Sequence, residues 1–143
     1  MTTVGILEIR KDKKSVLIYG RHDGYPDKWP LAAITWLFMN KYQDVDDAVD
    51  STLKLLLEWD GRVHKRINDP VDPSKDFYMT VDPPKIWAYW YTVDLDSGKI
   101  TVKYPVYCFE TEPHHYKCKD EPVMITEFEG NIKDYMFNYV TLL

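Results

Sequence analysis

The chain has 143 residues, which suits one domain and is short for two, because domains most often contain about 100 to 150 residues. Hydrophobic residues make up 45% and charged residues 29%, a composition that excludes a disordered or collagen-like chain. The net charge of -5 gives no overall positive field that would attract phosphate polymers or anionic lipid. We therefore expect a single domain over residues 1–143 and no extended nucleic acid as a partner.

No targeting or membrane segment is evident. No apolar run approaches the ~20 residues that a bilayer-spanning helix needs, and Glu8, Arg10 and Lys11 interrupt the region where a signal peptide has its apolar stretch. Cys108 and Cys118 can form at most one disulfide, too few to define a secreted disulfide scaffold. These features predict a cytoplasmic protein with no membrane partner.

The first half of the chain predicts a hairpin followed by two helices. Residues 4–9 and 15–19 are β-rich runs separated by a polar stretch, and the turn at residues 20–26 ends the second run. A helix is expected from Pro30 to Tyr42, with Asp27 as its cap. A second helix is expected from an Asp44 cap to a stop at Gly61, with an apolar stripe that includes Leu53 and Leu56.

The second half predicts strands and a short helix. Residues 68–75 carry two prolines between Asp residues and indicate a loop. Strands are expected at residues 77–81, 86–95, 99–107 and 123–128, with a tight turn at 94–98, and a helix at 131–139.

This order of elements predicts an α+β domain. We expect a mainly antiparallel sheet of five to six strands, with two central helices packed on one face and a short C-terminal helix. The strand at 86–95 carries aromatic side chains on both faces, so the second face also needs a cover. The third helix, a second sheet layer or another subunit could supply it, and the last option is a homodimer.

The turn at residues 20–26 is the leading candidate site. Arg21, His22 and Asp23 place a fixed cation, a titratable imidazole and a carboxylate in consecutive positions. A basic patch after the second helix could provide further contacts to phosphate. The predicted ligand-binding residues are Arg21, His22, Asp23, Tyr25, Arg62 and Arg66. Ordinary turn structure explains the same residues, because Asp-Gly is common turn chemistry, and both interpretations stay open.

The same segment carries a resemblance. The chain opens with a strand–turn–strand that includes Thr3, and Tyr19, Gly20 and the run His22 to Pro26 follow. This pattern resembles a widespread group of small uncharacterised proteins from bacteria and their phages. The resemblance covers about the first 40 residues. It implies a prokaryotic or viral cytosolic setting, and it implies no activity.

The N-terminus and the turn at residues 20–26 offer two catalytic alternatives. Removal of Met1 would leave Thr2 with a free α-amine beside a hydroxyl, the arrangement of an N-terminal nucleophile. His22 could act as a base oriented by Asp23. Either would make the chain a small hydrolase, with exposed Thr2 and turn structure as the simpler explanations.

Two cysteines and two histidines lie close together in the second half of the sequence. Two thiolates and two imidazoles from Cys108, His114, His115 and Cys118 could form a tetrahedral zinc site in a loop, but their spacing lacks a close Cys pair or a helical His pair. We expect no metal and no cofactor. The leading hypothesis is a non-catalytic binding or interaction protein that holds a small anionic ligand or a protein partner, although the sequence does not decide whether the chain is an enzyme.

Overall fold

The computed structural model describes residues 3–58, 77–80 and 86–140, and the chain is an α+β protein over these ranges. The predicted loop at 68–75 and the predicted stop at Gly61 lie outside them. The elements in chain order are β1 (Gly5–Lys11), β2 (Lys14–Gly20), α1 (Trp29–Met39), α2 (Val45–Glu58), β3 (Phe77–Thr80), β4 (Tyr89–Asp94), β5 (Lys99–Glu112), β6 (His115–Gly130) and α3 (Ile132–Tyr139).

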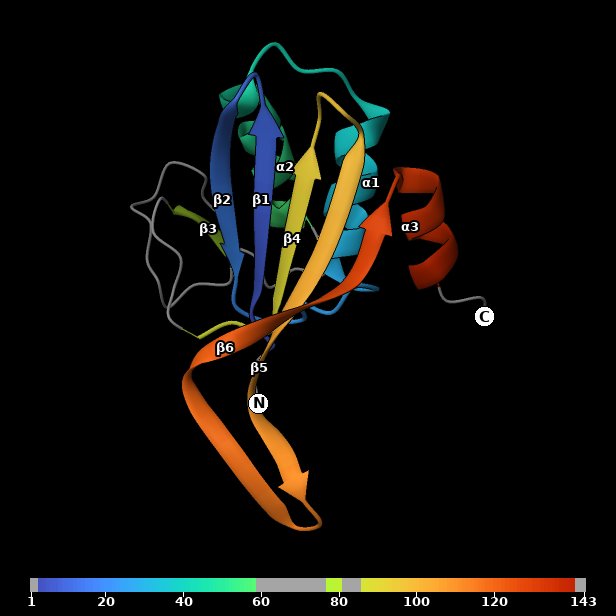
Figure 1. Ribbon diagram of the computed structural model, residues 1–143. Helices are drawn as coiled ribbons and strands as arrows, with labels where there is room; N and C mark the ends of the chain where they lie inside the picture. The colour runs from blue at the N-terminus through green and yellow to red at the C-terminus, as the bar shows by residue number, and fades with distance from the viewer. Residues whose placement is uncertain (1–2, 59–76, 81–85, 141–143) are drawn as a thin grey trace.

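The described strands form one mixed sheet in the order β3-β2-β1-β4-β5-β6 (Figure 1). β1 runs parallel to β4 at its centre, and the other neighbouring strands are antiparallel. The expectation of a mainly antiparallel sheet therefore has to be corrected at the central pair. The physical reason lies in the connection, because α1, α2 and β3 separate β2 from β4, and a long crossover of this kind lets two neighbouring strands run parallel where a hairpin turn cannot. Every residue of β1 from Gly5 to Ile9 is buried, as expected of a central strand.

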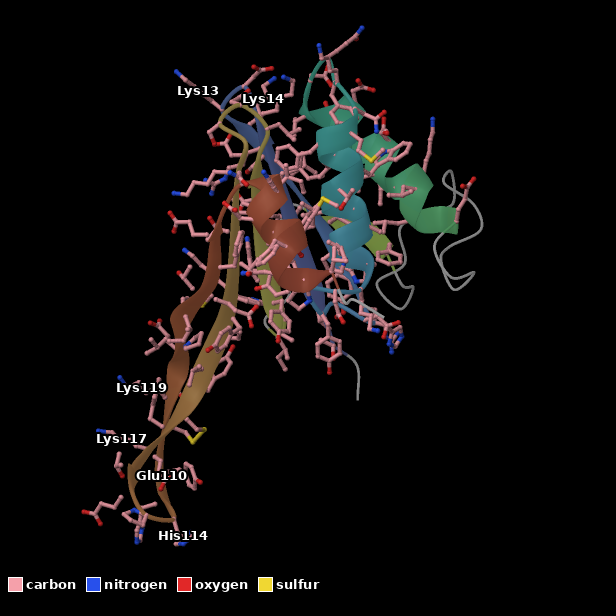
Figure 2. All side chains as sticks on the ribbon, turned by 90° about the vertical axis from the view of Figure 1, so that its right-hand side faces the viewer. Lys13, Lys14, Glu110, His114, Lys117 and Lys119 are labelled. Carbon is pink, nitrogen blue, oxygen red and sulfur yellow. A yellow bond between two sulfur atoms is a disulfide. The ribbon has the colours of Figure 1, made fainter. Side chains whose placement is uncertain are left out.

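All three helices of the described residues, rather than two of them, lie on one side of the sheet (Figure 2). α3 packs beside α1, and the buried Tyr135 of α3 donates its hydroxyl hydrogen to the Pro26 carbonyl oxygen at 2.9 Å. Because α3 joins α1 and α2, it does not cover the opposite face of the sheet, so one of the three covers that the sequence left open is wrong.

The helix boundaries confirm one predicted cap and correct another. The Asp47 backbone N–H donates to the Asp44 side chain at 2.8 Å, which is the expected cap of α2. In α1, Lys28 occupies the N-cap position and its side chain makes no capping bond, so the predicted Asp27 cap is wrong. Pro30 lies in the first turn of α1, where its missing N–H costs no helical hydrogen bond.

A pair of glycines brings α1 close to the sheet. Gly5 and Gly20 face each other across β1 and β2, and a Cβ atom at Gly20 would overlap the indole ring of Trp29. Trp29 is fully buried and meets Phe77 edge to face, with ring centroids 5.1 Å apart. The glycines thus create the room in which the first residue of α1 packs on the sheet.

The last two strands are much longer than predicted. β4 pairs with β5 only as far as Lys103, and both β5 and β6 then continue beyond the sheet to a turn at Pro113 and His114. His114 adopts a positive φ of 67° in that turn. Figure 1 shows this hairpin leaving the body as a projection, which we call the arm (residues 104–125). The expected loop around residues 108–121 is therefore wrong.

Candidate functional site

The predicted site turn lies between β2 and α1 and is tied to three parts of the fold. Its Gly24 N–H donates to the Thr3 carbonyl oxygen at 2.9 Å, and the buried Tyr91 hydroxyl donates to the Gly24 carbonyl oxygen at 2.6 Å. The Tyr135 hydroxyl donates to the carbonyl oxygen of Pro26, two residues after Gly24, as described above. Asp23 has a positive φ of 54°, a conformation that Asp tolerates in tight turns. The turn therefore has a clear structural role.

The predicted ligand residues are only partly brought together. Arg21, His22 and Asp23 are half-buried, and each of them interacts with other groups of the protein. Arg62 and Arg66 lie outside the described residues. Binding of a small anion by this set stays a prediction. Both hydrolase alternatives also stay predictions, and Thr2, on which one of them depends, lies outside the described residues.

Tyr25 brings the turn into contact with a feature that sequence reasoning missed. Its side chain is 46% exposed, and its ring centroid lies 6.1 Å from that of Tyr89. Tyr89 in turn contacts Tyr91 on its own strand and Tyr104 on β5, with centroids 6.1 and 6.4 Å apart. We call Tyr25, Tyr89, Tyr91 and Tyr104 the tyrosine cluster. It lies where the arm leaves the body.

A carboxylate borders the tyrosine cluster. The Tyr139 hydroxyl donates to Glu127 Oε2 at 2.8 Å, which fixes an exposed carboxylate near the base of the arm. Burial raises the pKa of Tyr89, and the negative charge of Glu127 raises it further. Burial also raises the pKa of Tyr91 well above its usual range. Both hydroxyls therefore ionise at a higher pH than an exposed tyrosine does.

The arm is held by a disulfide at the point where its backbone ladder is interrupted. Val106 pairs with Val123 and Cys108 pairs with Cys118, so Tyr107 alone stands opposite residues 119–122. The Cys108–Cys118 disulfide closes the first pair beyond this bulge. The two thiols are thus joined to each other. The described residues contain no group of three or more His, Cys, Asp or Glu side chains arranged to hold a metal ion.

The arm exposes both apolar and charged side chains. Every residue from Glu110 to Glu121 is exposed, and Figure 2 shows Glu110, His114, Lys117 and Lys119 on the projecting hairpin. Large apolar side chains are accessible as well, namely Tyr107, Tyr116, Val123 and Met124. Strand alternation and register place the pairs Tyr104–Ile125 and Val106–Val123 on one side of the arm, next to Tyr89.

The chain matches no protein-family model, no curated protein and no solved structure. The resemblance of its first 40 residues to the bacterial and phage group therefore stays a prediction. None of the described helices combines the length and the apolar character needed to cross a bilayer.

The sheet face opposite the helices carries a second polar arrangement that the sequence did not reveal. Glu8 is only 7% exposed, and its two carboxylate oxygens accept hydrogen bonds from Trp90 Nε1 at 3.0 Å and from Arg10 Nε at 2.6 Å. A buried carboxylate engaged at both oxygens is paired and satisfied, and here it fixes the position of the Trp90 indole.

Proposed function

We propose that the chain is a non-catalytic binding protein that recognises another protein through its arm. The observation behind this proposal is that the arm is a projecting hairpin whose outer residues add nothing to the hydrophobic core. An isolated two-stranded hairpin is only marginally stable in water. A structure that is stabilised by a disulfide and exposed on both faces is suited to insertion between, or against, the surfaces of a partner.

The side chains of the arm support this role. Tyrosine and methionine are enriched in protein interfaces, and the arm exposes Tyr107, Tyr116 and Met124. Beyond the end of β4, no strand of the described residues pairs with the outer edges of the arm, so an extended partner segment can pair with their backbone N–H and C=O groups. The tyrosine cluster at the base extends the same surface onto the body.

A deletion of the arm tests the proposal. Val106 and Val123 are partners in register, so replacing residues 107–122 with Asn-Gly closes the hairpin with a two-residue turn. The shortened protein is expected to melt within about 2 °C of the parent, because the deleted residues lie outside the core. Binding partners captured from a lysate of the source organism by the parent are expected to be lost.

Phe137→Ser is the matched control. Phe137 is 88% exposed on α3, so this variant removes an exposed apolar side chain of the body and leaves the arm intact. It is expected to capture the same proteins as the parent. Sedimentation velocity on all three proteins detects a second copy of the chain as the partner. Retention of the same partners, and the same oligomeric state, after arm deletion would contradict the proposed function.

A further inference from the structure

We infer that the tyrosine cluster and Glu127 form a binding site for a cationic side chain, arginine or lysine, of the protein that the arm contacts. This inference rests on the proposed function, and it adds the chemistry that the base of the arm recognises.

The rings of the tyrosine cluster provide the first part of the site. Tyr89 lies at its centre, and the rings of Tyr25 and Tyr104 are inclined to it by 59° and 61°. Tyr91 stacks on Tyr89 from the side of the core, with an interplanar angle of 27°. Tyr91 is fully buried, whereas Tyr25 is 46% exposed and Tyr89 and Tyr104 are half-buried. Aromatic surfaces in several orientations are thus accessible at one place.

Charge provides the second part. Glu127 is exposed, and its carboxylate is oriented by the hydroxyl of Tyr139. Besides burial, the pKa of Tyr89 is raised by Glu127, by neighbouring tyrosines and by Asp27. Two carboxylates therefore lie close enough to Tyr89 to influence its charge, and both belong to exposed residues.

These two features favour a cation over an anion or a purely apolar group. The face of an aromatic ring carries partial negative charge, so it attracts an ammonium or guanidinium group within about 6 Å of its centroid. A neighbouring carboxylate adds a charge partner for the same group. The arm contains one such contact already, with Lys119 Nζ 5.9 Å from the centroid of Phe109. The net charge of -5 also favours approach of a basic partner.

The test uses a small probe and a neutral copy of it. Nα-acetyl-arginine amide is titrated into the full chain at low salt while the tyrosine ring resonances are followed by NMR, and Nα-acetyl-citrulline amide replaces the guanidinium by an uncharged group of similar shape. We expect the arginine probe to shift the resonances of the tyrosine cluster with an affinity about fivefold or more above that of the citrulline probe.

Three variants locate the site. Glu127→Gln keeps a hydrogen-bond acceptor for Tyr139 and is expected to weaken arginine binding about threefold. Tyr89→Leu is expected to weaken it about fivefold or more. Tyr107→Leu, on the arm and outside the tyrosine cluster, is the control and is expected to bind as the parent does. Equal affinities for the two probes, or an unchanged affinity in Glu127→Gln and Tyr89→Leu, would overturn the inference.

The arm deletion separates this inference from the proposed function. The shortened protein keeps Tyr25, Tyr89, Tyr104 and Glu127, so it is expected to bind the arginine probe with unchanged affinity. If the shortened protein no longer captures the partners and still prefers the arginine probe over the citrulline probe, both the proposed function and the cation site are supported. Loss of capture without that preference overturns only the cation site, whereas capture that survives the deletion overturns only the function of the arm.

Discussion

Removing the Cys108–Cys118 disulfide is expected to release the tip of the arm and leave the body of the protein unchanged. The bulge at residues 119–122 separates the tip from the rest of the ladder, and a second irregularity lies between Glu110 and Glu112. Few regular backbone pairs therefore hold the tip. The cysteines are 10 residues apart, and closing a loop of this size stabilises it by about 3 kcal/mol in the chain-entropy description.

That free energy corresponds to a change of about 100-fold in the local opening equilibrium. The comparison is between the parent and Cys108→Ser/Cys118→Ser, by hydrogen–deuterium exchange read by mass spectrometry. Amides at residues 108–118 are expected to exchange about 100-fold faster in the variant, and amides of β1 and β4 at the same rate in both. Parent protein treated with a reductant, with its thiols then blocked, is expected to match the variant.

Two results would refute this reasoning. Unchanged exchange at the tip would mean that the backbone pairs alone hold it closed. Faster exchange in β1 and β4 as well would mean that the arm contributes to the stability of the core, contrary to the exposure of its outer side chains.

Leu56→Ala is expected to lower the free energy of unfolding, measured by urea titration, by about 2 to 5 kcal/mol. Leu53→Ala is expected to lower it by less, because Leu56 is fully buried and Leu53 only partly. Equal losses in the two variants would contradict this packing of α2. Gly20→Ala is expected to cost about 1 to 3 kcal/mol in the same assay, because the added methyl group meets the indole ring packed on β2; an unchanged urea midpoint would refute that contact. Stability is expected to fall as the pH rises above about 10, where tyrosines ionise in the unfolded chain, since burial raises the pKa of Tyr91 and keeps it protonated in the folded protein. Urea midpoints at pH 8 and pH 11 measure this loss, and Tyr91→Phe is expected to reduce it.

Local patterns in the sequence predicted the elements that local forces decide. The hairpin of β1 and β2 follows from two β-rich runs around a polar turn, and α2 follows from its Asp44 cap and its apolar stripe. Pro30 marked the start of α1 to within a residue. The Asp27 cap failed because several polar residues precede that helix, and only the backbone geometry selects one of them.

Contacts between distant parts of the chain could not be predicted in this way. The parallel pairing of β1 with β4 joins Leu7 to Tyr91, and nothing near either residue specifies the other. The tyrosine cluster combines Tyr25 with Tyr104 through Tyr89 for the same reason. The arm was missed because its exposed strands lack the alternation of apolar and polar residues by which a half-buried strand is recognised.

The position of β1 has a consequence for the order in which the chain folds. β1 precedes the other described elements in the sequence, yet its second neighbour is β4, which follows α1, α2 and β3. Until residues 89–94 have left the ribosome, one long edge of β1 has no partner, and its buried run from Gly5 to Ile9 is open to pairing with other chains. Nascent chains that end before β4 are therefore the species most prone to aggregate, and completion of β4 is the step that closes the centre of the sheet.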